Sequence, residues 1–256
     1  MHRQTIFVAG LVLALCGSVH AGGMQLTPRT SAAQAPRQAP VRVAKQWMKT
    51  ATKKVGSFLF APRAKGSFQE AMLFAAELHK TQVRKGTQTP YFSHLMGVSS
   101  MVLEYGGSEE EAIAALLHDG PEDQGGEKTL KLIEHRFGTR VAHLVDGLTD
   151  SKVEPKPAWR PRKEMYLRHL ATTDDSTRLV SMADKLYNAR AIVRDLRDDG
   201  PKSFGKFAGG HDGVLWYYRS LVDTYNKTSS KDSRILKDLT ETVDQMHDLA
   251  GPAPRS

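Results

Sequence analysis

The sequence predicts an all-α protein whose helices form one folded domain. Three observations support this class. From residue 67 onward, apolar residues recur at intervals of three and four, the spacing of an amphipathic helix. Clusters of Gly, Pro or Asp interrupt this spacing at nearly every join, and no segment shows the sustained alternation of a strand. With 256 residues, of which 40% are hydrophobic, the chain is long enough to bury a core.

Two of the helices begin at capping boxes. Ser67 and Glu70 have the spacing of this motif, and we expect the helix that they open to end just before Gly86. Ser108 and Glu111 repeat the spacing ahead of a second apolar segment. Periodicity predicts the other helices at 92–105, 128–136, 139–148, 160–171, 176–197, 211–226 and 232–249.

Composition divides the chain into four segments. Residues 1–21 combine a basic start, a short apolar run and small residues up to Ala21, which is typical of a signal peptide. Residues 22–66 are a basic linker rich in Pro and Ala, which we expect to be disordered. The folded domain is predicted over 67–228, followed by a C-terminal helix and tail over 229–256.

The leader leaves several locations open. Cleavage after Ala21 would make the protein periplasmic or secreted, whereas an uncleaved leader would leave it cytoplasmic or anchored. The segment ending at Cys16 also resembles a lipobox, but Leu15 is bulkier than that pattern prefers, so lipidation is the less favoured alternative. The mass of the mature protein from its native host distinguishes these outcomes.

Within the linker, residues 44–59 have the pattern of a basic amphipathic helix. Trp47, Phe58 and Leu59 belong to its apolar face, and four lysines lie between the apolar positions. Such a helix either contacts an anionic membrane surface or packs on the folded domain. The pattern favours neither alternative over the other.

The charge distribution and the cysteine content argue against several classes of protein. The formal net charge is +8, yet residues 1–69 hold ten of the 36 Lys and Arg and none of the 28 Asp and Glu. The folded domain therefore carries a small negative charge and has no electrostatic reason to bind nucleic acid. Cys16 is the only cysteine, which excludes a disulfide scaffold and a Cys-based metal site. The oligomeric state is not determined by these features.

Four features carry the candidate chemistry, and the first two lie close together in the sequence. His118-Asp119 follows directly after an apolar helix, and imidazole with carboxylate suits a divalent cation. Glu122-Asp123 lies three and four residues further on, where the carboxylates would repel unless a cation or a raised pKa relieves them. The alternatives are a capped helix end and a solvated turn.

Two further features complete the set. Asp184 interrupts a run of apolar residues, either as a metal ligand or as a partner of Lys185 or Arg190. Arg84-Lys85 precedes His94, an arrangement that suits an anionic ligand beside a metal, although His94 alone also fits a buried core position.

In order and context, these residues resemble the HD superfamily of metal-dependent phosphohydrolases. Five blocks are similar to the (p)ppGpp hydrolase domain of Rel/SpoT proteins and of the stand-alone small alarmone hydrolases. They lie at residues 84–86, 90–94, 114–123, 137–149 and 183–190. The resemblance covers about residues 67–228 and implies an all-helical HD-domain bundle with a manganese ion (Mn²⁺) and a small-molecule nucleotide substrate.

The resemblance also implies roles for individual residues. The implied metal ligands are His94, His118, Asp119 and Asp184. The implied catalytic pair, which handles the attacking water, is Glu122 and Asp123. The implied contacts with nucleotide and phosphate are Arg84, Lys85 and Asn188. The chain departs from the family at Gly120-Pro121, where an apolar pair is usual, and Pro121 could re-aim the following carboxylate because it fixes φ.

These features predict a metal-dependent hydrolase that removes the 3′-pyrophosphate, or a phosphate, from a guanosine alarmone such as (p)ppGpp or a related nucleotide. One alternative is an HD phosphatase of another small nucleotide. A second is an HD module that binds a nucleotide without turnover, but such a module has no need of Glu122 and Asp123. The alarmone is cytoplasmic whereas the leader predicts export, and the sequence leaves that conflict open.

Overall fold

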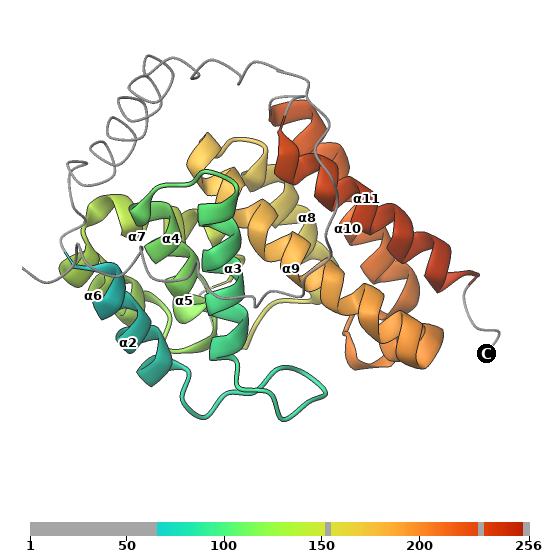
Figure 1. Cartoon of the computed structure of the whole chain (residues 1–256), viewed down its shortest axis with the longest axis horizontal. Coiled ribbons are helices and arrows are strands. Elements are labelled where there is room, and N and C mark those ends of the chain that lie inside the picture. The colour runs from blue at the N-terminus through green and yellow to red at the C-terminus, as the bar shows by residue number, and fades with distance from the viewer. Residues whose placement is uncertain (1–65, 152–154, 230–232, 253–256) are drawn as a thin grey trace, which may run out of the picture. The chain divides into compact units, whose positions relative to one another are not determined.

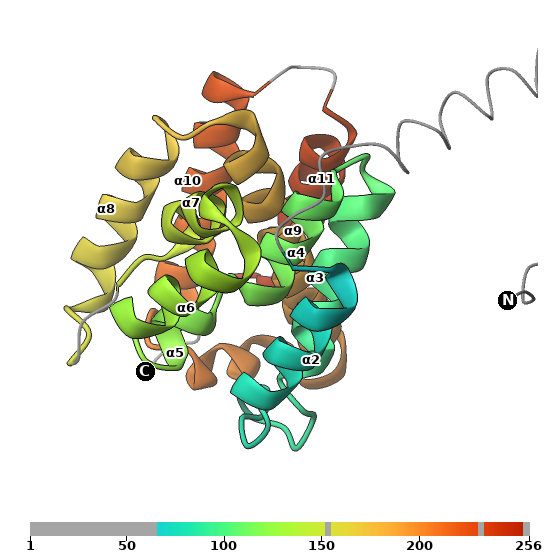
Figure 2. The same ribbon diagram turned by 90° about the vertical axis from the view of Figure 1, so that its left-hand side faces the viewer.

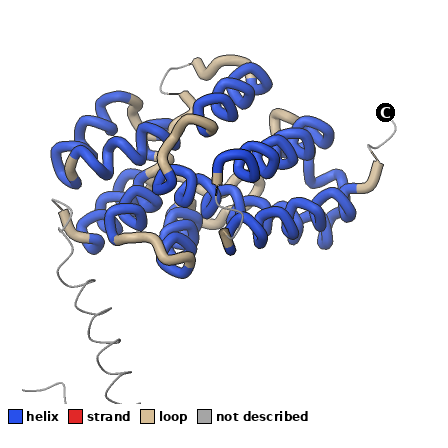
Figure 3. Tube along the Cα trace, turned by 90° about the horizontal axis from the view of Figure 1, so that it is seen from above, coloured by secondary structure: helices blue, strands red, loops and turns tan. Residues whose placement is uncertain are grey.

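The computed structural model describes residues 66–151, 155–229 and 233–252. These residues form helices joined by loops, with no strand among them and one isolated β-bridge between Val83 and Pro90 (Figure 3). The all-α prediction is confirmed. The helices are α2 (Phe68–Leu78), α3 (Phe92–Glu104), α4 (Glu109–Leu117), α5 (Gly120–Asp123), α6 (Glu127–Phe137), α7 (Thr139–Leu148), α8 (Trp159–Leu170), α9 (Asp175–Asp199), the 3₁₀ helix η1 (Gly200–Lys206), α10 (Gly210–Thr228) and α11 (Arg234–Ala250).

The predictions for the N-terminal segments lie outside the described residues. This applies to the signal peptide at 1–21, to Cys16, to the linker up to residue 65 and to the amphipathic segment 44–59. Among the helices that the structure describes, none has the length and apolar character needed to cross a membrane.

Both predicted capping boxes are present. The Ser67 Oγ accepts a hydrogen bond from the Glu70 backbone N–H at 3.2 Å, and Glu70 Oε2 accepts one from the Ser67 N–H at 2.6 Å. Ser108 and Glu111 make the same reciprocal pair at the start of α4. Each box satisfies two backbone donors that the first turn of a helix leaves without partners.

The predicted end of the first helix was wrong. Helix α2 ends at Leu78, well before Gly86. The chain then doubles back in a hairpin-like loop, residues 79–91, in which the Tyr91 N–H bonds to the Gln82 carbonyl and the Arg84 N–H to the Thr89 carbonyl, both at 2.8 Å. Gly86 serves the turn of this loop, where its φ of +77° is a conformation that favours glycine.

The core consists of two clusters of buried side chains. One is built around α9, α10 and α11, and includes Leu186, Leu221 and Leu239. The other joins α2, α4, α6 and α7, and includes Ile133 and Leu144. Figure 1 shows α2, α6 and α7 on one side and α10 and α11 on the other, while Figure 2 places α8 and α2 at opposite edges.

Helices α3 and α4 connect the two clusters. In α3, Val98 and Val102 belong to the α9 cluster, while Leu95 belongs to the other. In α4, Ala115 packs toward the first cluster and Leu116 toward the second. Both helices are therefore fixed from two sides, which makes them a rigid support for residues at their ends.

The C-terminal helix is part of the same core. Leu239, Val243 and Met246 of α11 are fully buried in the cluster built around α9. Residues beyond 228 thus contribute to the packing of the helix that carries Asp184.

Candidate active site

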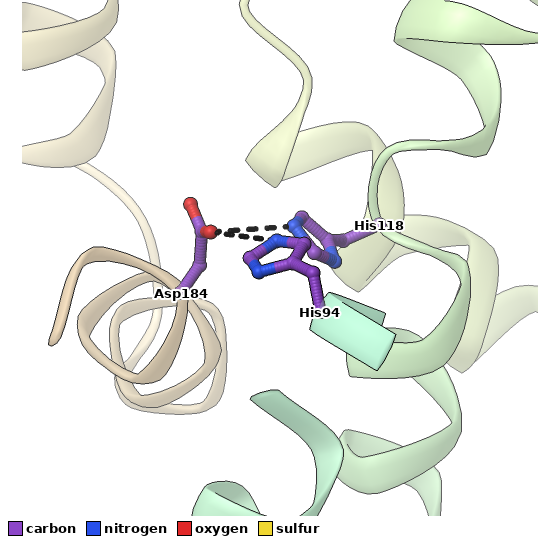
Figure 4. Close-up of side chains that lie close together, drawn as sticks. All are labelled: His94, His118 and Asp184. Atoms are coloured by element: carbon purple, nitrogen blue, oxygen red, sulfur yellow. Dashed lines mark ion pairs between the residues drawn. The ribbon is translucent and has the colours of Figure 1, made fainter. Parts of the chain in front are cut away.

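Three residues that are far apart in the sequence meet at the junction of the two core clusters. His94 lies in the first turn of α3, His118 directly follows the last residue of α4, and Asp184 lies in the middle of α9. Their ligand atoms all lie within 4.8 Å of one another, and all three residues are buried. Figure 4 shows the two imidazole rings converging on one carboxylate oxygen.

Asp119 completes a set of four donor atoms. The His118 Nε2 lies 3.0 Å from Asp119 Oδ2 and 3.6 Å from Asp184 Oδ1, and the corresponding distances from His94 Nε2 are 3.5 and 3.2 Å. Ligands about 2.1 Å from a shared cation lie about 3.0–3.4 Å apart in octahedral or tetrahedral geometry. The four atoms therefore have the spacing of a coordination site for a divalent cation.

The protonation pattern of the histidines fits the same site. The His118 Nδ1 lies 2.8 Å from the Ala115 carbonyl and donates to it, which leaves the Nε2 lone pair directed at the carboxylates. Among the described residues, the buried Nε2 atoms of His94 and His118 have no partner other than the carboxylate oxygens of Asp119 and Asp184, 3.0–3.6 Å away. Coordination of a cation would satisfy both nitrogens and both carboxylates.

The electrostatics show how negative this centre is. Burial lowers the pKa of His118, but the Asp119 and Asp184 carboxylates outweigh it and hold the pKa well above the ordinary value. Burial raises the pKa of Asp119 and of Asp184, yet His118 beside Asp119, and Lys185 with both histidines beside Asp184, bring each pKa well below its usual range. In the absence of a cation, a proton on His118 balances these carboxylates.

Neighbouring side chains hold each candidate carboxylate ligand in place. The Tyr91 hydroxyl donates to Asp119 Oδ2 at 2.6 Å. Lys185 donates to Asp184 Oδ2 at 2.6 Å, while Asn188 donates to Oδ1 at 2.7 Å. Lys185 was predicted from the sequence as a partner of Asp184. The contact from Tyr91 to Asp119 was not predicted, and its only signal in the sequence was the position of Tyr91 in the block around His94.

The acidic pair lies on the short helix α5, directly after Asp119. Glu122 is half-buried and Asp123 is exposed, and Lys156 bridges them with its ammonium 3.0 Å from Glu122 Oε1 and 3.1 Å from Asp123 Oδ1. Burial, followed by repulsion from Asp150 and Asp119, raises the pKa of Glu122 from 4.5 to about 7. A carboxyl in this range can exchange a proton near neutral pH.

Gly120-Pro121 forms the start of this helix. Pro121 occupies the first turn, where a missing N–H costs nothing, and is buried. A Cβ on Gly120 would lie 3.0 Å from the Leu78 side chain and 3.3 Å from that of Thr129, so α5 approaches α2 and α6 closely at this glycine. The departure from the family pattern thus coincides with tight packing beneath the pair.

A cleft of about 530 Å³ adjoins the centre. The lining of this cleft includes Glu122 and Asp123. A smaller recess, lined by His118, Asp119 and Asp184, shares Lys163 and Lys185 with the cleft. The predicted substrate-binding residues Arg84, Lys85 and Asn188 all line the cleft. Arg84 does so while donating to the Asn188 side-chain carbonyl at 2.8 Å.

The cleft is strongly cationic in the part of the chain that the structure describes. Its basic side chains are Arg84, Lys85, Lys156, Arg162, Lys163, Lys185 and Lys206. Its acidic side chains are Glu122, Asp123 and Asp195. Sequence reasoning missed Lys156, Arg162, Lys163 and Lys206, although the basic run near 160–163 was a signal for two of them. Such an excess of positive charge suits a ligand with several phosphate groups.

Comparison with known proteins agrees with this geometry. Residues 71–209 match the HD domain family. The guanosine-3′,5′-bis(diphosphate) 3′-pyrophosphohydrolase MESH1 of Xenopus tropicalis is 41% identical over 128 residues, which are 49% of this chain and 69% of that protein. MESH1 of Drosophila melanogaster is 35% identical over 172 residues, which are 66% of this chain and 89% of that protein.

A solved structure of a metazoan ortholog of SpoT that hydrolyses ppGpp has the same fold. It aligns with a TM-score of 0.57 and 30% identity over 72% of this chain and 96% of the other. The family match spans more than half of the chain and includes all four candidate ligands and the acidic pair. The chain belongs to the HD domain family and is homologous to the MESH1/SpoT (p)ppGpp hydrolases.

Proposed function

We propose that this protein is a metal-dependent hydrolase that removes the 3′-pyrophosphate from guanosine 3′,5′-bis(diphosphate) or a closely related nucleotide. The observation that carries the proposal is the placement of four cation-binding atoms, from His94, His118, Asp119 and Asp184, beside an acidic pair at the wall of a cationic cleft. The similarity to hydrolases of this alarmone supports the substrate class.

A divalent cation held by these four residues would polarise a phosphoryl oxygen and lower the pKa of a water molecule. We propose Mn²⁺, because two imidazoles and two carboxylates suit a borderline or hard cation and the family resemblance implies manganese. The acidic pair orients the attacking water, and Glu122 accepts its proton, a role that its raised pKa of about 7 supports near neutral pH.

The cationic side chains bind and orient the substrate. Lys163 and Lys185 line both the recess at the candidate metal ligands and the larger cleft, and this shared position supports a role in binding the reacting diphosphate. Arg84 and Lys85, on the loop 79–91, line the same cleft and offset further phosphate charge. Asn188 reaches the same cleft and couples substrate binding to the orientation of Asp184.

The experiment is a product analysis. Purified protein reconstituted with Mn²⁺ is incubated with guanosine 3′,5′-bis(diphosphate), and the products are separated by ion-exchange chromatography. Equal amounts of GDP and pyrophosphate support the proposal. Turnover restricted to nucleotides without a 3′-diphosphate would favour an HD phosphatase of different specificity, and tight binding without turnover would favour a binding module. Either result overturns the proposal.

A further inference from the structure

A chain of hydrogen bonds connects a buried histidine to the acidic pair. His79 lies directly after α2 and is 2% exposed. Its Nδ1 lies 2.6 Å from the Gln82 side-chain oxygen, and the Gln82 amide nitrogen lies 2.9 Å from Asp123 Oδ2. Gln124 Nε2 also donates to the Gln82 side-chain oxygen, at 2.8 Å.

These partners determine which way the Gln82 amide points. Burial lowers the pKa of His79, which favours the neutral ring, and Nδ1–H donates to Gln82 Oε1 because an amide oxygen can only accept. With two donors on the Gln82 oxygen, its NH₂ group must face Asp123. The reverse orientation would place the amide oxygen against a carboxylate oxygen at 2.9 Å, two acceptors with no proton between them.

The backbone beneath this contact is fixed on both sides. The Gln82 N–H donates to the His79 carbonyl at 3.0 Å, and its own carbonyl accepts from the Tyr91 N–H at 2.8 Å. On α5, the Asp123 N–H donates to the Asp119 carbonyl at 2.9 Å. The Gln82 amide and the Asp123 carboxylate thus meet from two rigid supports, 41 residues apart in the sequence.

We propose that Gln82 is a positioning residue for the hydrolysis. Its amide N–H holds Oδ2 of Asp123, while Lys156 holds Oδ1, so that the carboxylate keeps a single orientation at the cleft wall. This inference rests on the proposed function, in which Asp123 orients the attacking water. Misplacement of such a group by about 1 Å can reduce turnover roughly a hundredfold.

A purely structural role makes a different prediction. If Gln82 only ties the loop 79–91 to α5, its removal lowers the melting temperature and leaves the chemistry of the folded protein unchanged. If it positions Asp123, the turnover number falls while folding, metal content and substrate affinity are retained.

The test compares two Gln82 variants with matched controls. Gln82→Met removes donor and acceptor together, and Gln82→Glu keeps an acceptor for His79 and Gln124 but removes the donor to Asp123. The controls are Gln245→Met and Gln245→Glu, at an exposed position of α11. We expect both Gln82 variants to lower kcat about 10–100-fold, with KM and Mn²⁺ affinity within about twofold of the wild type. Unchanged kcat in folded Gln82→Glu overturns the inference.

A double-mutant cycle with Asp123→Asn then tests whether the effect passes through Asp123. If it does, the double variant Gln82→Met/Asp123→Asn is no slower than Asp123→Asn alone, within about twofold. Losses that multiply would show that Gln82 acts elsewhere and would also overturn the inference. Failure of the proposed function is a separate result, because it appears as absent alarmone hydrolysis in the wild type.

Discussion

Asn188 stands one helical turn after Asp184 and donates its Nδ2–H to Oδ1, the oxygen that faces both histidines, at 2.7 Å. Its own side-chain oxygen accepts from Arg84 at 2.8 Å. Asn188, which is expected to contact the substrate, therefore also orients a candidate metal ligand. It links that ligand to the Arg84 side chain on the loop 79–91.

This relationship predicts that Asn188→Ala weakens metal binding as well as turnover. Loss of the donor frees Asp184 to rotate, and the loss of such supporting contacts typically lowers metal affinity about 10–100-fold. Titration of the metal-free protein with Mn²⁺ measures the affinity. Asn226→Ala, at an exposed position of α10, is the matched control and should bind like the wild type. Equal Mn²⁺ affinity in both variants would contradict the role in orienting Asp184.

The candidate metal site predicts one divalent cation per chain. Elemental analysis after reconstitution with Mn²⁺ and removal of free metal should give this ratio in the wild type, and His118→Ala should lose most of the cation because one of four donors is missing. His135→Ala, at an exposed position of α6, controls for nonspecific binding to imidazole. A wild-type protein that retains no metal would rule out the centre.

The acidic pair predicts a loss of turnover without a loss of metal. Glu122→Gln and Asp123→Asn should each lower kcat roughly a hundredfold or more, the scale of general acid–base catalysis, because each removes a charged group that handles the water. Both should bind Mn²⁺ like the wild type, since neither residue is among the four candidate ligands. Full activity in both variants would remove the pair from the mechanism.

The raised pKa of Glu122 predicts a pH-dependent cost in stability. Its pKa is about 7 in the folded protein against an ordinary value of 4.5, so the folded state holds the proton more tightly than the unfolded state. Stability is therefore unaffected below pH 4.5 and falls as the pH rises through about 7. In metal-free protein, Glu122→Gln should have a melting temperature near that of the wild type at pH 4.5 and above it at pH 8.

The control for this measurement is Glu134→Gln, at an exposed position of α6. Its melting temperature should follow that of the wild type at both pH values. A Glu122→Gln variant that is destabilised equally at pH 4.5 and 8 would show that the cost of burying this carboxylate is already offset, for example by Lys156.

The capping box at Ser67 predicts that the helical domain from residue 66 onward folds without the preceding segment. Deletion of residues 1–65 should leave a folded enzyme with nearly full activity, since the helix start is satisfied internally and the contacts of the site begin at His79. Gly66 must remain, because it packs against the Phe137 ring and the Arg136 carbonyl. Loss of activity in a folded 66–256 protein would mean that the deleted segment reaches the site.

The same deletion tests the amphipathic segment 44–59. Proteins spanning 22–256 and 66–256 are compared for thermal stability and for co-sedimentation with anionic vesicles. If the segment binds membranes, the longer protein alone should sediment with vesicles while both melt at the same temperature. If it packs on the helical domain, the shorter protein should melt at a lower temperature and neither should sediment.

Much of the helical structure and the order of the site could be predicted from the sequence. Amphipathic periodicity and capping boxes are local properties, so the predicted helix over 139–148 has the observed bounds and both boxes are present. His118 and Asp119 were predictable for the same reason, because the apolar segment before them ends where α4 ends.

Only the tertiary structure decided how these residues combine. The contacts from Gln82 to Asp123 and from Arg84 to Asn188 join residues 41 and 104 positions apart, and their formation depends on how α2, α5 and α9 pack. Helix α2 ends at Leu78 because residues of the loop 79–91 form hydrogen bonds with one another and with α5. The apolar periodicity of the sequence carries no information about these contacts. The raised pKa of Glu122 likewise results from burial and from charges that packing brings near it. Local patterns determine helices, whereas the geometry and charge of a site depend on contacts between helices.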